Sequence, residues 1–262
     1  TACMDHFLYR DGILHAEDVS VETIADEVGT PAYIYSTATI ERHYNVFAEA
    51  IGAPRHHVFY AMKANSNLAI LKTLGRLGAG ADTVSEGEVR KALAAGIPAD
   101  RIVFSGIGKS ERELAFAVAA GIYQINIESE SELELLSRVA AAQGRRQDAV
   151  IRVNPDVGAG GHAKITTGSD ANKFGVSFAT AARIFSRAAN MPGVRMLGLA
   201  THIGSQIVDL GKLEAAFQRM RTLAEDLRRD GHAIERIDLG GGLGIPYEIP
   251  ETFDHGPSLI HD

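Results

Sequence analysis

The chain contains 262 residues, of which 45% are hydrophobic and 23% charged, and this balance excludes disorder over the whole length. No run of about 18 or more apolar residues occurs, which excludes a transmembrane helix. The net charge of -7 excludes a broad basic surface for nucleic acid. Cys3 is the single cysteine, so an intramolecular disulfide and a cysteine-based zinc site are excluded, and a reducing cytoplasm suits the protein.

The first elements expected are two short strands, 7–10 and 12–15. They are joined by an Asp-Gly pair, which favours a tight hairpin turn. A helix is expected over 20–28, where a serine provides the cap. Gly29 is placed to end this helix, and Pro31 prevents it from resuming.

Strand-like and helical segments alternate through the rest of the chain. The apolar runs that predict strands are 32–35, 58–62, 81–84, 102–105, 124–127, 149–153, 197–202 and 236–239. The amphipathic stretches that predict helices are 37–51, 68–77, 86–95, 110–119, 129–143, 179–188 and 210–229. This alternation indicates βαβ units and a parallel sheet.

Seven strands can be counted from residue 58 onward, one short of a closed (β/α)₈ barrel. An open Rossmann-type sheet fits the same spacing. The periodicity stops after Tyr247. We therefore expect an N-terminal segment at 1–35, an incomplete α/β barrel at 36–247 and a loose tail at 248–262.

Lys63 and Asp82 fall at the ends of consecutive expected strands. A lysine at the carboxyl end of a barrel strand can form a Schiff base with an aldehyde cofactor if its pKa is lowered. A lysine that simply reaches solvent is the alternative. A carboxylate near Lys63 would help to hold that nitrogen in its charged form, and the alternative for Asp82 is an ordinary helix cap.

Arg152, His202, Ser205 and the glycines 240–242 also fall at strand ends. An arginine in a barrel mouth is costly unless it meets an anion or a carbonyl, and a serine there can donate to a phosphate oxygen. A histidine can stack on an aromatic cofactor, and glycines let backbone N–H groups approach a phosphate. Each has a plainer alternative, a polar strand cap or a flexible turn. Together they point to one site, because barrel strand ends converge on one mouth.

Two further patterns predict no site of their own. The pair His56-His57 lacks the spacing of a helical metal-binding pair and is interpreted as exposed loop. The glycines that follow strand 236–239 do not form a dinucleotide fingerprint, because Ile245 stands where its last glycine or alanine is needed. A phosphate-binding turn remains the functional interpretation of these glycines.

Longer segments match a known family. They are YAMKANSNLAIL, RIVFSGIGKS, RVNPDV, HAKITTG, NKFGV, HIGSQI and DLGGGLGIPY. Together they resemble the fold-type III pyridoxal-phosphate-dependent decarboxylases, from about residue 7 to residue 247. The block at 60–65 is shared with ornithine and arginine decarboxylases, whereas the RVNPDV, HAKITTG, NKFG and HIGSQ segments are more particular to the diaminopimelate decarboxylases.

The resemblance implies roles for individual residues. The catalytic pair would be Lys63, which forms a Schiff base with pyridoxal 5'-phosphate, and His202, which stacks on its pyridine ring. Lys173 in NKFG would contact the other subunit of a homodimer. The other cofactor-binding residues would be Asp82 beside the Schiff base, Arg152 near a ring oxygen, and Ser205, Gly240, Gly241 and Gly242 around the phosphate.

The implied activity is the decarboxylation of meso-diaminopimelate to L-lysine by a cytoplasmic enzyme of lysine biosynthesis. Its partner would be a small amino-acid substrate, with no nucleic acid, membrane or metal involved. A decarboxylase of the same fold that acts on ornithine, arginine or carboxynorspermidine is one alternative. A barrel that carries the cofactor without catalysing a reaction is another.

The sequence also departs from the family pattern. Relatives carry a further strand, whose glutamate pairs with the pyridine nitrogen, and a β domain that supplies substrate-binding groups; neither is recognised here. We therefore expect a C-terminally truncated form with a gap in the barrel, and exposed strand edges that promote association. Strands at 5–16 would lack partners. Cofactor binding would be weak and lost in Lys63→Ala, and the chain alone would not decarboxylate.

Overall fold

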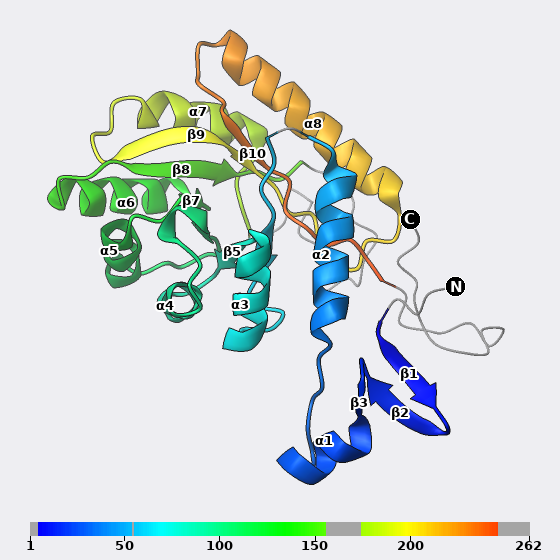
Figure 1. Ribbon diagram of the computed structural model, residues 1–262. Coiled ribbons are helices and arrows are strands. Elements are labelled where there is room, and N and C mark those ends of the chain that lie inside the picture. The colour runs from blue at the N-terminus through cyan, green and yellow to red at the C-terminus, as the bar shows by residue number, and fades with distance from the viewer. Residues whose placement is uncertain (1–4, 54, 156–173, 246–262) are drawn as a thin grey trace.

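The computed structural model describes residues 5–53, 55–155 and 174–245. It contains a small N-terminal unit and a parallel sheet with helices (Figure 1). The N-terminal unit comprises β1 (Phe7–Arg10), β2 (Ile13–Ala16), β3 (Val19–Ser20) and α1 (Val21–Val28). After it, α2 (Thr37–Ile51) leads into the alternating part of the chain.

The alternating part has the elements that the sequence predicts. Its strands are β4 (Phe59–Ala61), β5 (Gly80–Thr83), β6 (Ile102–Phe104), β7 (Gln124–Ile127), β8 (Gln147–Arg152), β9 (Val194–Ala200) and β10 (Arg236–Asp238). Its helices are α3 (Leu68–Leu77), α4 (Glu86–Ala94), α5 (Glu111–Ala120), α6 (Glu130–Ala142), α7 (Phe178–Ala188) and α8 (Leu210–Arg229), with a 3₁₀ turn at Ala99–Arg101. Serine or asparagine side chains cap the start of α3 to α7, which explains why these helices begin where they do.

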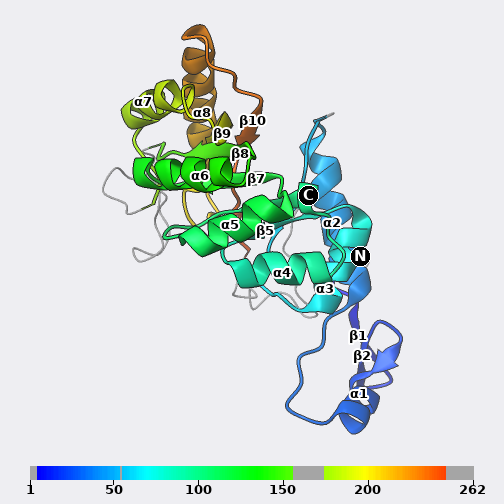
Figure 2. The same ribbon diagram turned by 90° about the vertical axis from the view of Figure 1, so that its left-hand side faces the viewer.

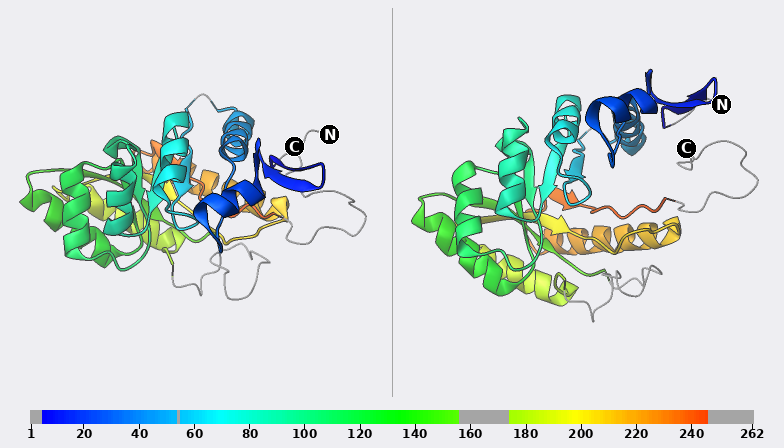
Figure 3. Two further views of the ribbon diagram at one scale, coloured as in Figure 1. Left: turned by 60° about the horizontal axis from the view of Figure 1, so that its bottom comes forward. Right: turned by 90° about the horizontal axis from the view of Figure 1, so that it is seen from below.

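The seven strands form one parallel sheet in the order β10-β9-β8-β7-β6-β5-β4. The strands follow one another in chain order, and the sheet curves with α3 to α7 along its outer side (Figure 3). This arrangement confirms most of a β/α barrel and excludes a doubly wound open sheet, whose strand order would reverse. Within the described residues, no strand pairs with the outer side of β4 or of β10.

The core lies between the sheet and its outer helices. All residues of β6 and β7 are buried. Phe104 and Ile125 on these strands are fully enclosed, as are Leu133 and Leu136 on α6. Burial on both faces is the normal state of a parallel sheet and accounts for the continuous apolar runs in the sequence.

The N-terminal unit folds partly as expected. The hairpin and the helix capped by Ser20 are present, but the strands do not lack partners: β1, β2 and β3 pair with one another in an antiparallel sheet. The hairpin turn allows this pairing locally. Several of its apolar side chains are exposed, including Leu8 and Val19, and Tyr9 reaches 74%. Figure 2 shows this unit at the end of the molecule opposite α7 and α8.

The strand expected over 32–35 does not form. Tyr33 is 92% exposed, and no described strand lies beside this segment to accept its backbone hydrogen bonds. The apolar run that predicted a strand is therefore a connection between α1 and α2. None of the helices in the described ranges combines the length and the apolar character needed to cross a membrane.

Candidate cofactor-binding site

The expected site residues gather at the carboxyl edge of the parallel sheet. Lys63 follows β4, Asp82 lies in β5 beside Ala61, and Arg152 ends β8. His202 and Gly240 each follow their strands, β9 and β10, by two residues. The parallel order of the strands thus brings residues separated by almost 180 positions to one edge, as the sequence predicts.

Lys63 lies close enough to Asp82 to affect the charge of that carboxyl group. Lys63 is exposed, and the backbone N–H of Met62 donates to the carbonyl of Asp82 at 3.0 Å, which fixes the loop on β5. Burial raises the pKa of Asp82 to about 6, helped by the charge of Asp238, while the Ser105 hydroxyl and Lys63 act in the opposite direction. Asp82 therefore titrates within reach of neutral pH.

Arg152 is held by two hydrogen bonds from its terminal nitrogens, which leave its Nε without a partner among the described residues. Its Nη1 donates to Oε1 of Glu128 at 3.0 Å, and its Nη2 donates to the carbonyl of His202 at 3.3 Å. Glu128 is buried and also accepts from the backbone N–H of Gly175. The Nε of Arg152 is buried with no hydrogen-bond partner among the described residues. A buried donor of this kind suits an acceptor atom of a ligand.

His202 is partly buried beside two positive charges. Burial, together with the positive charges of Arg152 and Lys63, lowers the pKa of His202 to about 4. The imidazole is therefore neutral at physiological pH. A neutral ring at this edge is suited to packing against an aromatic ligand, whereas a third cation beside Arg152 and Lys63 would be repelled.

The loops after β9 and β10 are joined by backbone hydrogen bonds. Ile207 donates to the carbonyl of Gly242 at 2.8 Å, and Gly244 donates to the carbonyl of Ile207 at 2.9 Å. A Cβ atom on Gly242 would lie 1.9 Å from the carbonyl oxygen of Gly204, and one on Gly240 would lie 2.3 Å from that of Thr201. Both glycines also have positive φ, 70° at Gly240 and 96° at Gly242. Only glycine permits this close approach.

Sequence reasoning missed four residues of the site: Ser105, Asn126, Glu128 and Asp238. Ser105 and Glu128 directly follow β6 and β7, and Asp238 ends β10, so their strand-end positions were a signal that could have found them. Asn126 lies within β7 and carries no such signal. Its contacts reach across the sheet, which a single sequence does not reveal.

These features fit pyridoxal phosphate, the cofactor that the resemblance implies. The glycine loop leaves room for a phosphate at Gly241, where no atom lies within 4 Å of the position that a Cβ would take. The unused Nε of Arg152 provides a donor, and neutral His202 provides an aromatic face. No group of three or more metal-binding side chains occurs in the part of the chain that the structure describes. Lys173 lies outside the described residues.

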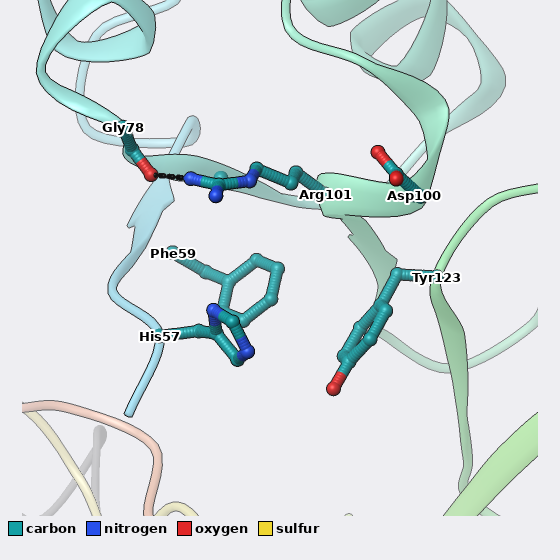
Figure 4. Close-up of a pocket in the computed structure, with 7 residues that line it drawn as sticks. His57, Phe59, Gly78, Asp100, Arg101 and Tyr123 are labelled. Carbon is teal, nitrogen blue, oxygen red and sulfur yellow. Dashed lines mark hydrogen bonds between the residues drawn. The ribbon is translucent and has the colours of Figure 1, made fainter. Parts of the chain in front are cut away.

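A cavity of about 300 Å³ lies at the opposite edge of the sheet (Figure 4). It is lined by residues at the amino ends of β4 to β7: His57, Phe59, Gly78, Gly80, Asp100, Arg101 and Tyr123. His56 and His57 are exposed, as expected for a loop, and His57 also meets Phe59 and Tyr123 edge-on. Barrel enzymes use the other edge for chemistry.

Comparisons with known proteins agree with this geometry. The family model "Pyridoxal-dependent decarboxylase, pyridoxal binding domain" matches residues 37–257, ten residues beyond the point where the sequence alone suggested that the resemblance ends. A diaminopimelate decarboxylase from Pseudomonas fluorescens is 46% identical over 260 residues, which cover 99% of this chain and 61% of that protein. The chain thus spans about three fifths of the length of this relative.

Two solved structures show the same fold. The diaminopimelate decarboxylase from Helicobacter pylori, complexed with L-lysine, has a TM-score of 0.85 and 38% identity, covering 88% of this chain and 59% of that one. The enzyme of that name from M. jannaschii, also with L-lysine, has a TM-score of 0.88 and 34% identity, covering 95% and 59%. The chain belongs to the pyridoxal-dependent decarboxylases, through their pyridoxal-binding domain, and its cofactor is pyridoxal phosphate.

Proposed function

We propose that this chain provides the pyridoxal-phosphate-binding part of a decarboxylase that converts meso-diaminopimelate to L-lysine. The observation that supports the proposal most is the gathering of Lys63, Asp82, Arg152 and His202 at one edge of the sheet, beside the glycine loop. Relatives that carry the name diaminopimelate decarboxylase are 41% to 46% identical to the chain. L-lysine, the product of this reaction, is present in two solved relatives.

Each residue would hold one part of the cofactor. Lys63 would hold the aldehyde carbon through its Nζ, and the neutral ring of His202 would lie against the pyridine ring. Arg152 would donate from Nε to a ring oxygen. The phosphate would be bound by Ser205 and the glycine loop 240–242, in which Gly240 and Gly242 have positive φ. Because the N–H of Gly240 donates to Asp238, the N–H groups offered to the phosphate would be those of Gly241 and Gly242.

The charges around Lys63 suit a reaction in which a carboxylate leaves as CO₂. When bound, pyridoxal phosphate supplies the electron sink for the bonding pair that the departing carboxylate leaves behind. Asp82, with its pKa near 6, can hold a proton or a negative charge beside the Lys63 nitrogen. Neutral His202 adds no positive charge to the side occupied by Arg152 and Lys63. These groups bind and orient, and the bound substrate determines which bond breaks.

We further propose a cytoplasmic homodimer, with residues 36–247 as the barrel domain, 1–35 as a segment that joins a β domain in relatives, and 248–262 as a tail, of which the family model matches residues 248–257. Lys173 would contact the second subunit. The support for the dimer and for Lys173 is the resemblance, because this lysine and the tail lie outside the described residues. Size measurement by light scattering, compared between the wild type and Lys173→Ala, tests the dimer.

Cofactor binding can be tested on the chain itself. The 262-residue chain is titrated with pyridoxal phosphate, reduced with borohydride, and digested for mass spectrometry. We expect the trapped cofactor on Lys63 and no trapping in Lys63→Ala, whereas Lys72→Ala, an exposed lysine of α3, behaves as the wild type. Trapping at another lysine, or equal trapping in Lys63→Ala, would contradict the assignment.

Turnover needs a separate test, because the chain spans 61% of the Pseudomonas fluorescens relative. CO₂ release is measured with the 262-residue chain and with a chimera that continues into the remainder of that relative. We expect no release from the chain alone. We expect the chimera to prefer meso-diaminopimelate over L-ornithine by about 100-fold or more in kcat/KM. A chimera that prefers L-ornithine or L-arginine would establish the alternative within the same fold.

A further inference from the structure

Four polar side chains form one chain of hydrogen bonds across the inner side of the sheet. Ser105 Oγ donates to Oδ1 of Asp82 at 2.6 Å, and Asn126 Nδ2 donates to Ser105 Oγ at 3.0 Å. The same Nδ2 of Asn126 donates to Oδ2 of Asp238 at 2.9 Å. The other oxygen of Asp238 accepts from the backbone N–H of Gly240 at 2.8 Å. The chain therefore runs from the side of Lys63 to the glycine loop.

The direction of these bonds is fixed by Asn126. Its Oδ1 accepts from Nε2 of Gln124 at 2.8 Å, so its Nδ2 must face Ser105 and Asp238. Ser105 receives a donor from Asn126 and therefore directs its own proton to Asp82. Asn126 is 4% exposed, and its backbone carbonyl accepts from Lys109 Nζ at 2.7 Å. A buried residue bonded at both ends has little freedom to rearrange.

The bond between Asn126 and Asp238 joins strands that are not neighbours. In the sheet order, β9 and β8 lie between β10 and β7. The bond therefore crosses the concave side of the sheet and ties the edge strand β10 to the buried centre. In the described residues β10 has a strand partner on one side only, so this bond adds a second support to the strand that carries the glycine loop.

We propose that Asn126 and Asp238 are positioning residues that set the place of Gly240, and with it the phosphate end of the site, relative to Asp82 and Lys63. The inference rests on the proposed function. Pyridoxal phosphate is a rigid ring with its aldehyde and its phosphate arm at different positions, so both ends bind well only at one spacing of the two loops. The described charged groups that act on Asp82 are Asp238, Lys63 and Glu88. Ser105 and Asn126 lie between the carboxylates of Asp82 and Asp238, which are linked through three hydrogen bonds.

Exchange of the two side chains tests the link. Asp238→Asn places two NH₂ groups face to face, or, with its amide reversed, loses the bond from Gly240. Asn126→Asp places one carboxylate against another. The double variant Asn126→Asp with Asp238→Asn restores a donor and an acceptor, and its net charge equals that of the wild type. Asp226→Asn, an exposed position on α8, makes the same chemical change far from the site.

The primary measurement is the Kd of pyridoxal phosphate for the 262-residue chain, followed by the absorbance of the cofactor. We expect each single variant to raise Kd by about 10-fold, and the double variant to return within about 3-fold of the wild type. Asp226→Asn should leave Kd unchanged. The inference would be overturned if Asp238→Asn had the Kd of the wild type. It would also be overturned if the Kd of the double variant were as high as the higher Kd of the two single variants.

Thermal unfolding without cofactor separates this inference from the proposed function. If the wild type binds no pyridoxal phosphate, the proposed function fails. The Tm values of the wild type, the two single variants and the double variant still report whether Asn126 and Asp238 interact. We expect both single variants to lower Tm by about 3 to 6 °C and the exchange to recover at least half of the loss. Additive losses in the double variant would show that the two residues are independent.

Discussion

The middle and the edges of the parallel sheet differ in burial and in content. Every residue of β6 and β7 is buried, whereas all residues of β4 and β10 are at least partly exposed. The middle strands supply large apolar side chains to the core, such as Phe104 and Ile125. The edge strands are followed by Lys63 and by the glycine loop. The centre of the sheet thus carries the packed core, whereas Lys63 and the glycine loop, both proposed to bind the cofactor, follow its two edge strands.

This division has a physical reason. An edge strand has fewer neighbours, so the loop that follows it can approach a ligand from a free side. An edge strand is also held less firmly in place, so side-chain hydrogen bonds to the central strands must compensate. Asp238 and Arg236 on β10 both make such bonds, to Asn126 and to Asp148 respectively. The following substitutions test this comparison.

Phe104→Ala should show the largest effect. Phe104 is 0% exposed, and its removal leaves a cavity that the packed centre cannot fill, so the free energy of unfolding should fall by about 3 to 5 kcal/mol. Ile237→Ala on β10, where the side chain is 41% exposed, should cost less than about 1 kcal/mol. Urea unfolding of both variants measures the difference. Equal losses would mean that the edge is as well packed as the centre.

Lys109→Ala should cost about 3 kcal/mol, because it leaves the carboxylate of Glu132 buried without its cation. Lys109 Nζ donates to that carboxylate and to the carbonyls of Gly106 and Asn126. Burial raises the pKa of Glu132, and Lys109 opposes this rise. In the folded variant the pKa of Glu132 should therefore rise further, and folding should be accompanied by proton uptake at a pH closer to neutral.

The double variant Lys109→Met with Glu132→Leu is the control for this ion pair. It removes both charges together, so it should be more stable in urea than Lys109→Ala. The ion-pair explanation is wrong if the double variant is as unstable as the single one.

Arg236→Ala tests how firmly the edge strand β10 is attached, with an expected loss of about 1 to 2 kcal/mol. The guanidinium of Arg236 lies 3.8 Å from the ring centre of Tyr123 and donates to the carbonyl of that residue and to Asp148. Arg229→Ala on α8, where the side chain is 72% exposed, should cost less than about 0.5 kcal/mol. Hydrogen exchange should show the loss of protection in β10 first, and uniform loss would contradict a local role.

Near pH 4, Asp82→Asn should have the smallest effect of these substitutions, and the effect should grow as pH rises. The pKa of Asp82 is raised from 3.8 to about 6, so the folded state holds a proton that the unfolded state releases between these values. Wild-type stability contributed by this group is therefore lost as pH rises from about 4 to 6. The gain in Tm from Asp82→Asn should grow over the same interval.

His202→Gln is a control in which the change of stability with pH should have the opposite direction. The pKa of His202 is lowered from 6.5 to about 4, so the unfolded state binds the proton first and the wild type loses stability as pH falls through this interval. The gain from His202→Gln should therefore grow toward low pH. If the gain in Tm changed with pH in the same direction for both variants, groups other than Asp82 and His202 would determine the pH dependence of stability.

Most of the fold could be predicted from the sequence because local signals agree with one another. Helices α2, α3 and α8 and strand β7 have the predicted bounds, and the other barrel elements differ by a few residues at their ends. The segment 32–35 shows the limit of this reasoning. Its composition suits a strand, but a strand also requires a neighbour, and the sequence does not tell which segments become neighbours.

The site shows the same limit. Lys63, Asp82, Arg152 and His202 could be found because each stands at the end of a predicted strand. The contacts among them could not, since the partner of Asp238 is 112 positions away in Asn126, in the middle of a strand. A strand pattern predicts which face a residue occupies, but it does not show which side chain it meets on the far side of a curved sheet.

The paired loops at 204–207 and 242–244 have a consequence for how fast and how tightly an anion is captured. Because Ile207 donates to the carbonyl of Gly242 and accepts from the N–H of Gly244, the backbone at this edge is held in place before any ligand arrives. Little conformational entropy is then lost on binding, and association needs no slow rearrangement. The loop proposed to bind the phosphate is therefore fixed before binding, while the exposed Lys63, which follows the other edge strand, can adjust its long side chain to a molecule held there.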